Sequence, residues 1–400
     1  MNSSRSYRVG LNALLLESSQ VSYRQAGIHN YLKGILPHLT AAGSSFCYTA
    51  LVNHPHPGVS PGCKVYRVSR RTASPVIRVA WEQFVQPWVT RLERLDLLHS
   101  MAFVSPVISG VPTVVTMYDL SFLKVPDCFR SVQRVYLSLF SRVSCRRAQR
   151  VIAISECTKR DVVAHFGVQN ERVDVIYPGI SDRFKRASPA AVAEFRERRG
   201  LPETFVLYLG TIEPRKNLSL LIHAFDRLRS LGVKLICVGG KGWMYEDVFR
   251  TVENLDLNDH VLFPGYVPRD ELPLWYSAAT AFVYPSNYEG FGIPLLEALA
   301  CGTPSLASNA SSLPEVAGGA AVLFPPDDVN HLAEALSHTL NDASLRVELS
   351  EAGPLQAKRF RWSTAGQLTV LSYARALDLS LAGLSDNKRL GGRRLGEPWN

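Results

Sequence analysis

The feature that most constrains this chain is the alternation of strand-like and helix-like segments along nearly its whole length. Short runs rich in β-branched and aromatic residues predict strands, and segments with a 3.6-residue apolar period predict helices. The clearest helical segment is 217–230, in which Leu218, Leu221 and Phe225 share one face. Such alternation predicts an α/β chain with parallel sheets and helices on both sheet faces. The strands are expected at 9–16, 46–52, 113–117, 151–154 and 173–177 in a first series, and at 205–210, 233–238, 260–263, 280–284 and 320–324 in a second.

The two series meet at Tyr177-Pro178-Gly179, where proline and glycine together mark a turn or hinge. We therefore predict two doubly wound domains of similar size, at 1–178 and 179–365. A closing helix is expected at 366–385, and the basic tail at 386–400 is expected to be disordered. Ligands of doubly wound sheets bind outside the carboxyl ends of the strands. Two such domains facing each other therefore predict a site in the cleft between them.

Composition indicates an ordinary globular protein of a reducing compartment. Hydrophobic residues make up 46% and charged residues 20% of the chain. No apolar run reaches the roughly 18–20 residues of a membrane helix, and the first apolar patch, interrupted by Asn12, predicts a strand and not a secretory signal. The seven cysteines are scattered without a C-x-x-C pair, which argues against a disulfide framework or a zinc site. We therefore expect a cytoplasmic protein.

The formal net charge of +9 favours anionic partners such as phosphates, acidic lipid surfaces or nucleic acid. Basic residues gather between Arg142 and Arg150 and again between Lys388 and Arg394. No zinc-finger spacing and no aromatic–basic RNA-binding motif accompanies them, so we expect no nucleic-acid role. Two interpretations stay open: a solvated basic face, and peripheral contact with the anionic inner face of a membrane.

The most informative stretch reads Y-P-S-N-Y-E-G-F-G-I-P-L-L-E. An apolar strand ends, a loop with Gly290 and Gly292 follows, and a helix begins near Pro294. Free backbone N–H groups and the helix dipole therefore meet at the strand's carboxyl end, a geometry suited to a phosphate. Glu289 in the loop and Glu297 in the first helical turns can each accept hydrogen bonds from a vicinal diol. A sugar and a ribose would satisfy this pair, whereas a chance Glu-Gly before a helical glutamate is the alternative.

The segment E-G-F-G-I-P-L-L-E resembles the E-x7-E motif of the retaining glycosyltransferases of family four, which have the GT-B fold. The later segments C-G-T-P-S and S-L-P-E-V resemble that family's usual continuation. The resemblance is strong over most of the second domain and weaker in the first. It implies two Rossmann-like domains, with Glu289 contacting the transferred sugar and Glu297 the nucleotide ribose. The donor-binding residues of this loop would include Gly290, Phe291, Gly292 and Ile293.

A basic loop follows the expected strand at 205–210. Gly210 ends the strand, and Arg215 and Lys216 stand just before a helix that Asn217 could cap. Two cations beside a helix N-terminus can neutralise a diphosphate and stabilise it as a leaving group, whereas a basic surface turn is the alternative. Within the resemblance, Lys216 matches the family's diphosphate-binding lysine, and Gly210 belongs to the donor site.

This loop departs from the family pattern at one position. Many members carry arginine directly after the strand's glycine, where this chain has Thr211. Arg215 is predicted to take over that charge, with Glu213 ordering the loop. Further along, the segment F-P-G-Y-V with Tyr266 resembles the family segment whose backbone meets the nucleobase, and a structural turn is the alternative.

The first domain carries the expected acceptor half of the site. Gly27 opens a helical stretch, and in the family a glycine here approaches the donor phosphates across the cleft; a plain helix start is the alternative. We expect His29, one turn into this helix, to be an exposed helical histidine, and a ligand contact is the alternative. His99, in the strand-like segment L-D-L-L-H-S, is expected to be structural.

Tyr118 and Asp119 follow the strand 113–117, where many relatives have histidine and then aspartate. A tyrosine hydroxyl can donate a hydrogen bond, but it is a poor base near neutral pH. A role that depends on the histidine is therefore in doubt in this chain. Asp119 is predicted to orient the loop or to meet the acceptor, and a turn-forming aspartate is the alternative.

The resemblance implies a glycosyltransferase that moves a hexose from GDP-mannose or a UDP-sugar to a hydroxyl of a saccharide or lipid-linked acceptor, in cell-surface polysaccharide or glycolipid synthesis. It implies retained configuration, no metal and no further cofactor, and the sequence has no D-x-D at a strand end in the cleft. Two rivals stay open, a GT-B sugar-nucleotide epimerase and a catalytically silent carbohydrate-binding protein. The residues expected to carry catalysis are Glu289, Lys216, Arg215 and Asp119.

Overall fold

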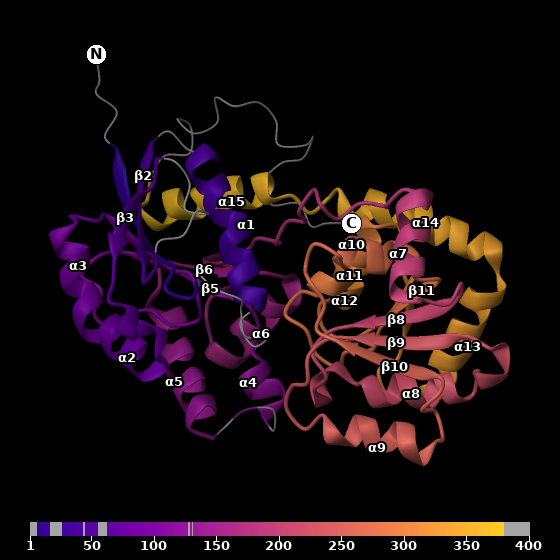
Figure 1. Cartoon of the computed structure of the whole chain (residues 1–400). Coiled ribbons are helices and arrows are strands. Elements are labelled where there is room, and N and C mark those ends of the chain that lie inside the picture. Colours follow the sequence, from indigo (N-terminus) through magenta and orange to yellow (C-terminus); the bar gives the residue numbers. More distant parts are fainter. Residues whose placement is uncertain are drawn as a thin grey trace.

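The structure is a computed structural model that describes residues 6–16, 26–42, 45–54, 62–126, 129 and 131–379. The described strands form two sheets, one of seven strands in the first half of the chain and one of six in the second (Figure 1). The strands of both sheets pair in parallel. The predicted α/β class with two doubly wound sheets is confirmed, and the predicted tail at 386–400 lies outside the described residues.

The first sheet has the strand order β3-β2-β1-β4-β5-β6-β7. A π-helical turn at Trp81–Val85 joins its helices α2 and α3. Its strands are β1 (Tyr7–Asn12), β2 (Phe46–Val52), β3 (Lys64–Arg67), β4 (Leu97–Ser100), β5 (Thr113–Met117), β6 (Arg150–Ala153) and β7 (Val173–Val175). Its helices are α1 (Ala26–Ala42), α2 (Pro75–Ala80), α3 (Gln86–Leu92), α4 (Ser121–Lys124), α5 (Ser131–Arg147) and α6 (Glu156–Phe166).

The second sheet has the order β10-β9-β8-β11-β12-β13. Its strands are β8 (Phe205–Leu209), β9 (Lys234–Val238), β10 (Val261–Gly265), β11 (Ala281–Tyr284), β12 (Ser305–Ser308) and β13 (Val322–Phe324). The helices of this half are α7 (Pro189–Arg199), α8 (Leu218–Asp226), α9 (Glu246–Asn254), α10 (Leu272–Ala278), α11 (Ile293–Ala300), α12 (Leu313–Ala317), α13 (Val329–Asn341), α14 (Ala343–Ala357) and α15 (Trp362–Ala376).

Apart from β4, which falls in the strand-like segment L-D-L-L-H-S, two strands of the structure have no counterpart among the predicted ones. β3 is a largely exposed edge strand with one β-branched residue, and β12, S-L-A-S, has none. Neither shows the run of β-branched residues on which the prediction depended. β3 forms because it pairs with β2, and β12 forms because it pairs with β11 on one side and β13 on the other. In each case the neighbouring strand offers a ladder of hydrogen bonds.

Each sheet has one point where the strand order reverses, between β1 and β4 in the first sheet and between β8 and β11 in the second. At such a switch point the connections on the two sides leave in opposite directions, so ligands bind between the carboxyl ends of the two strands. Asn12 ends β1 beside Ser100 of β4. The two switch points are therefore the places where the fold itself favours a ligand.

The chain passes between the two halves twice. It leaves the first half after β7 and returns through α15, which packs against α1 (Figure 1). This helix begins at Trp362 and ends at Ala376, earlier at both ends than the predicted 366–385. The two passages touch, because the Ile180 N–H donates to the Phe360 carbonyl over 3.0 Å.

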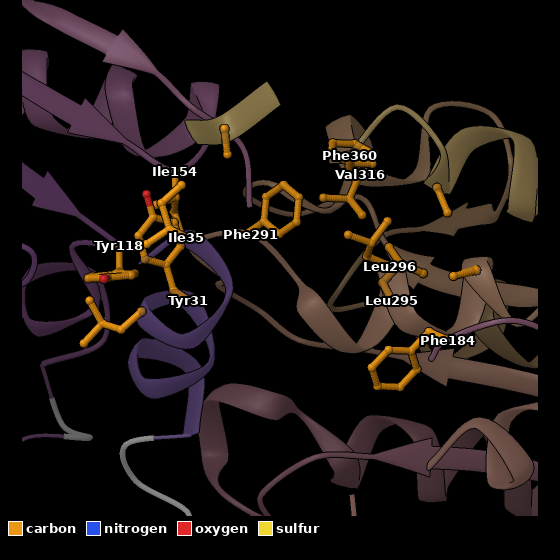
Figure 2. Packing of buried hydrophobic residues seen from close by; sticks show 14 of the residues in the cluster. Tyr31, Ile35, Tyr118, Ile154, Phe184, Phe291, Leu295, Leu296, Val316 and Phe360 are labelled. Carbon is orange, nitrogen blue, oxygen red and sulfur yellow. The ribbon is translucent and has the colours of Figure 1, made fainter. Parts of the chain in front are cut away.

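One apolar cluster runs from the first half into the second (Figure 2). Tyr31 and Ile35 of α1 lie at one end, and Leu295 of α11 lies in the other half. Where the halves meet, the Phe291 ring lies 5.4 Å from Phe360 and 5.9 Å from Tyr177. A fully buried large apolar side chain stabilises a fold by about 1.5–3 kcal/mol, so this cluster holds the halves together.

Two histidines of the first half, His29 and His99, differ in how well the sequence predicted their surroundings. His99 is fully buried, with Nδ1 2.7 Å from the Tyr373 hydroxyl and Nε2 2.8 Å from the Thr116 hydroxyl, which confirms its structural role. The prediction for His29 was wrong, because its side chain is 9% exposed. α1 is covered by α15 and contacts β2, and the local sequence of α1 does not reveal that cover.

We expect Gly34→Ala to destabilise the protein by on the order of 1–3 kcal/mol through overpacking. A Cβ at Gly34 of α1 would lie 2.2 Å from the Trp362 ring of α15. Gly27→Ala in the same helix is the matched control, since its Cβ meets nothing within 4 Å. Urea unfolding should give a lower midpoint for Gly34→Ala only; equal midpoints would show that the α1–α15 contact is loose.

Candidate active site

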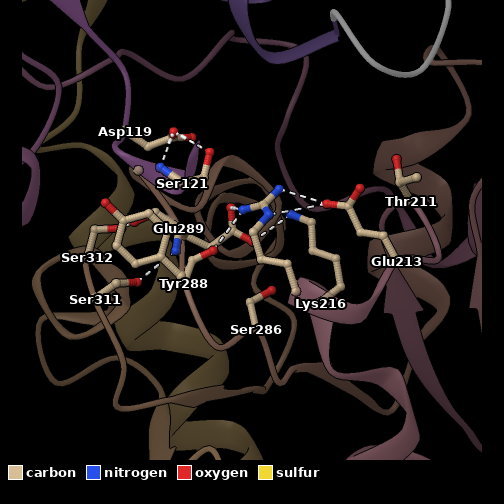
Figure 3. A network of polar contacts seen from close by, with 12 residues as sticks. Asp119, Ser121, Thr211, Glu213, Lys216, Ser286, Tyr288, Glu289, Ser311 and Ser312 are labelled. Carbon is tan, nitrogen blue, oxygen red and sulfur yellow. Dashed lines mark hydrogen bonds and ion pairs between the residues drawn. The ribbon is translucent and has the colours of Figure 1, made fainter. Parts of the chain in front are cut away.

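Three of the predicted site residues, Arg215, Lys216 and Glu289, gather at the switch point of the second sheet. Arg215 and Lys216 lie in a 3-10 turn, Pro214–Lys216, that follows β8. Glu289 lies in the loop between β11 and α11. Because β8 and β11 are adjacent parallel strands, both loops leave the same edge of the sheet, and Figure 3 shows their side chains converging.

Glu289 is held between the two cations. Lys216 Nζ donates to Glu289 Oε1 over 2.5 Å, and Arg215 Nη1 donates to Oε2 over 3.0 Å. The Tyr284 hydroxyl donates to Oε1 over 3.0 Å and accepts from Lys216 Nζ over 2.7 Å. Glu289 and Lys216 are 7% and 8% exposed, so this is a buried ion cluster and not a surface salt bridge.

The charges of the cluster fix its protonation. Burial raises the pKa of Glu289, but the neighbouring Arg215 and Lys216 together lower it to about 2. Burial lowers the pKa of Lys216, against the opposing effect of Glu289. Burial also lowers the pKa of Arg215, yet Glu289 and Glu213 hold it well above its usual value. Near neutral pH the cluster therefore offers an ionised carboxylate beside a guanidinium.

Backbone contacts lock the two loops to one another. Arg215 Nη1 donates to the Tyr288 carbonyl over 2.7 Å, and the Asn287 N–H donates to the Arg215 carbonyl over 2.9 Å. Arg215 also donates to Glu213 through Nε and Nη2, so Glu213 orders the loop as expected. These hydrogen bonds hold the Arg215 guanidinium, and therefore its positive charge, in a fixed position.

Asn217 does not act as the predicted side-chain cap of α8. It occupies the N-cap position with φ 54°, and its side chain makes no capping hydrogen bond. Its Nδ2 donates instead to Asn287 Oδ1 over 2.9 Å and to the Pro326 carbonyl over 2.7 Å. Because the Asn217 backbone is in the left-handed region, its side chain points away from α8 and joins three loops of the second domain.

Glu297 lies on α11 and is 4% exposed. The Tyr276 hydroxyl donates to its Oε2 over 3.1 Å, and Arg269 Nη2 lies 3.5 Å from its Oε1. Burial raises the pKa of Glu297 to about 7, and Arg269 offsets only part of that effect. The two predicted glutamates therefore differ in charge state. Near neutral pH Glu289 is ionised, whereas Glu297 is divided between its ionised and its protonated form.

The glycine loop meets the first domain. A Cβ at Gly290 would lie 2.0 Å from the Tyr118 carbonyl and 3.0 Å from Asp119 Cβ, so only glycine allows this approach. Gly292 has φ 103° and precedes Ile293, the first residue of α11. The Phe291 side chain is 2% exposed in the apolar cluster, so only its backbone is available to a ligand.

Tyr118 and Asp119 are engaged within the first domain. The Tyr118 hydroxyl donates to the Met101 carbonyl over 2.7 Å, and burial raises its pKa well above the usual value. Asp119 Oδ1 accepts from the Ser121 N–H at 2.9 Å and from the Ser121 hydroxyl at 2.6 Å (Figure 3). Asp119 therefore forms the turn that was its alternative interpretation, and it lies across the interface from Gly290.

Further residues join the domains, and the sequence did not single them out. The Glu315 carboxylate of α12 accepts from the N–H groups of Glu156 and Cys157, at the start of α6, over 2.9 and 3.0 Å. Tyr288 donates to Asp161 Oδ2 over 2.7 Å. In the sequence, only the S-L-P-E-V segment, which contains Glu315, indicated the contact between Glu315 and the start of α6.

The other predicted residues lie apart from the ion cluster. Gly210 continues β8, and its N–H donates to the Val238 carbonyl over 3.0 Å. Tyr266, just after β10, is 73% exposed, and Gly27 stands open at the start of α1. Among the residues that the structure describes, no group of three or more His, Cys, Asp or Glu side chains could hold a metal ion. Within the same ranges, no helix is both long and apolar enough to cross a membrane.

Two doubly wound domains, joined beside a carboxylate–cation cluster at a switch point, have the architecture of a GT-B glycosyltransferase. Solved structures of this fold are similar over nearly the whole chain. Sucrose-phosphate synthase from Thermosynechococcus elongatus has a TM-score of 0.73 at 22% identity, covering 93% of this chain and 99% of its own. Anabaena HepE, in complex with UDP and glucose, has a TM-score of 0.69 at 20% identity, covering 92% and 100%. At these identities the likeness shows the fold alone.

Sequence comparison shows the family. A family model described as Glycosyltransferase Family 4 matches residues 27–184, and one described as Glycosyl transferases group 1 matches residues 192–356. O-antigen chain mannosyltransferase B of Escherichia coli is 32% identical over 72% of this chain and 76% of its own length. Several further relatives are matched over 30% to 60% of their length. The chain belongs to glycosyltransferase family four.

We expect the stability of the protein to fall as pH rises through the range set by Glu297. Its carboxyl has a pKa of about 7 when folded, against 4.5 when exposed, so between these values the folded protein binds a proton that the unfolded chain has lost. Glu297→Gln removes this dependence. Urea midpoints between about pH 5 and pH 8 should fall more for the wild type than for Glu297→Gln. Glu253→Gln, at an exposed carboxylate of α9, should follow the wild type; three parallel profiles would contradict the assignment.

Proposed function

We propose that this glycosyltransferase moves a hexosyl group, with retention of configuration and without a metal ion, from a nucleotide-sugar donor to an acceptor hydroxyl. The observation that carries this proposal is the buried cluster of Glu289, Lys216 and Arg215 at the second switch point. This cluster supports the proposal because a carboxylate that could accept from a sugar hydroxyl lies beside two cations that could attract a diphosphate.

The cluster has donors left for a phosphate. A lysine ammonium has three N–H groups, and Lys216 uses one for Glu289 and one for Tyr284. Its third N–H can meet a phosphate oxygen while the first two hold the side chain in place. Glu289 and Glu297 are proposed to accept from the sugar and ribose hydroxyls, and the backbone at Gly292 and Ile293 adds the N-terminus of α11.

The proposed reaction is a same-face substitution at the anomeric carbon. The acceptor oxygen forms a bond to the anomeric carbon on the face from which the diphosphate departs, and the bond from that carbon to the phosphate oxygen breaks. The acceptor proton goes to the departing phosphate oxygen. Tyr118 and Asp119 already have partners within their own domain, which fits a reaction without a protein base.

We propose mannose as the transferred sugar and GDP-mannose as the donor, with a UDP-sugar as the second candidate. The support for mannose is the name of the Escherichia coli relative, and the support for a UDP-sugar is the UDP and glucose in the HepE complex. The acceptor is proposed to be a growing cell-surface polysaccharide or a glycolipid, used in the cytoplasm.

We further propose peripheral contact with an anionic membrane face. The 75–92 segment and α5 line one shared cavity, and both carry exposed apolar side chains. Exposed arginines such as Arg91, Arg134 and Arg142 accompany them, and 131–150 contains no acidic residue. A symmetric pair of copies would set these arginines against one another, whereas anionic lipid complements them. The apolar residues are Val76, Ile77, Phe84, Val85, Trp88 and Leu92 on the first segment and Val132, Val135 and Leu139 on α5.

We expect Lys216→Ala to lower kcat by on the order of 10²–10³-fold, the usual cost of one lost donor to a developing anion. Lys234→Ala is the control, because Lys234 begins β9 at the opposite edge of the sheet. Thermal shifts with GDP-mannose, UDP-, dTDP- and ADP-sugars identify the donor, since a ligand at 100 times its Kd adds about 2.7 kcal/mol. Full activity of Lys216→Ala, or no shift with any donor, would refute the proposal.

The membrane contact predicts that the double variant Trp88→Ser, Leu92→Ser binds vesicles rich in anionic phospholipid at least about tenfold more weakly than the wild type. Added salt should weaken wild-type binding. Val347→Ser, Leu355→Ser on α14 removes similarly exposed apolar residues from the second domain and serves as the control. Sedimentation with vesicles gives the measure; an equal loss in both double variants would exclude this surface.

A further inference from the structure

The switch point of the first sheet also carries a buried polar cluster, formed by Asn12, Glu82 and Gln86. Asn12 ends β1 there and is 7% exposed. Its Nδ2 donates to Glu82 Oε1 over 3.0 Å and to Gln86 Oε1 over 3.4 Å. Glu82 lies in the π-helical turn and Gln86 begins α3. Widened helical turns of this kind occur often at functional sites.

One donor of this cluster has no partner. Asn12 Oδ1 accepts from the Leu14 N–H over 3.3 Å, which fixes the orientation of the amide and turns its Nδ2 towards Glu82 and Gln86. Gln86 must then present its oxygen to Asn12, and its fully buried Nε2 has no hydrogen-bond partner. A buried hydrogen-bond donor without an acceptor destabilises a fold by about 1–3 kcal/mol. Its presence in a native fold therefore calls for a specific explanation, such as a functional role.

A cavity of about 60 Å³ opens beside this cluster. Asn12, Arg78 and Glu82 form its polar side, and Phe103 and Tyr136 supply aromatic rings to its wall. This volume holds several water molecules or the hydroxyl-bearing edge of one sugar ring. Carboxylate, amide and guanidinium groups beside aromatic rings suit a ring with hydroxyls on its edge and C–H groups on its face.

The cavity lies close to the donor site. The Phe103 ring lies 5.5 Å from the Tyr118 ring. The Tyr118 carbonyl in turn touches the Gly290 position of the loop that carries Glu289. Tyr118 therefore separates the cavity from the glycine loop. A larger hollow of about 310 Å³ lies beside Thr113, which begins β5, at the opposite edge of the sheet, where ligands of parallel sheets do not bind.

We propose that this cavity receives the hydroxyl-bearing edge of a hexosyl ring of the acceptor, with Glu82 accepting hydrogen bonds from its hydroxyls. The proposal rests on the proposed function, and it names the acceptor as a neutral saccharide end held at the first switch point. Burial raises the pKa of Glu82 to about 7 despite the nearby Arg78, which agrees with a carboxyl that lacks full solvation until a ligand arrives.

The first test needs no donor. Isothermal titration of the full-length protein with the methyl α-glycosides of mannose, glucose, galactose and N-acetylglucosamine should show binding of at least one. Glu82→Gln should weaken that binding by about 10-fold or more, the value of a hydrogen bond to a charged group. Glu171→Gln, at an exposed carboxylate of the same domain, should bind like the wild type. No binding by the wild type, or equal binding by Glu82→Gln, would overturn the proposal.

The second test separates this proposal from the proposed function. With the donor that the thermal-shift screen identifies and the bound glycoside as acceptor, Glu82→Gln should raise the acceptor KM and leave donor hydrolysis unchanged. Tyr136→Phe removes the hydroxyl that lies near Glu82 and Arg78 in the cavity wall but keeps the ring contact with Phe140, at 4.9 Å between centroids, so it should raise the same KM without a loss of stability. An unchanged acceptor KM in both variants overturns the cavity assignment alone. Loss of donor hydrolysis in Glu82→Gln with a normal acceptor KM would show a structural role and also overturn it.

Discussion

The pairing of the buried Glu289 carboxylate with Lys216 and Arg215 is the interaction on which the donor half of the molecule depends. Three charges within one dry site are tolerated because each has a partner of opposite sign at 2.5 to 3.0 Å. The partners come from two loops, so the pairing also sets the distance between the carboxyl ends of β8 and β11. Removal of the Glu289 carboxylate would leave the buried Lys216 ammonium without a partner of opposite charge, whereas removal of either cation would leave Glu289 paired with the other one.

The departure at Tyr118 changes the meaning of the first domain's loop. A histidine there would present a polar ring to the donor, whereas Tyr118 directs its hydroxyl to the Met101 carbonyl and its own carbonyl to Gly290. Its ring lies near Phe103 on one side and Tyr31 on the other. Tyr118 thus lies between the two switch points. The Thr158 hydroxyl makes polar contacts on both sides of it, at 3.1 Å from the Tyr118 carbonyl and 3.3 Å from the Gly290 carbonyl.

The sequence predicted what short-range patterns control. The two series of strands, the glycine loop after β11 and the cations after β8 follow from local composition, because strand, turn and helix start each have a residue signature. Contacts between elements distant in the chain have no such signature. The burial of His29, the pairing of Glu315 with the start of α6 and the cluster at Asn12 each need the second partner in view. Asn217 was misjudged for a related reason, since its left-handed backbone points the side chain at Asn287 and not at its own helix.

The double passage of the chain between the halves limits how they can move. The segments at Ile180 and Phe360 lie side by side and share a hydrogen bond, so they act as one narrow hinge at one edge of the interface. Elsewhere, the pairs Tyr288–Asp161 and Glu315–Cys157 hold the halves by hydrogen bonds that water can replace when they separate. Separation of the halves at these contacts therefore exchanges protein partners for water at little net cost, whereas the apolar cluster of Tyr177, Phe291 and Phe360 opposes it. A ligand that contacts both halves would favour whichever arrangement lets it keep both sets of contacts.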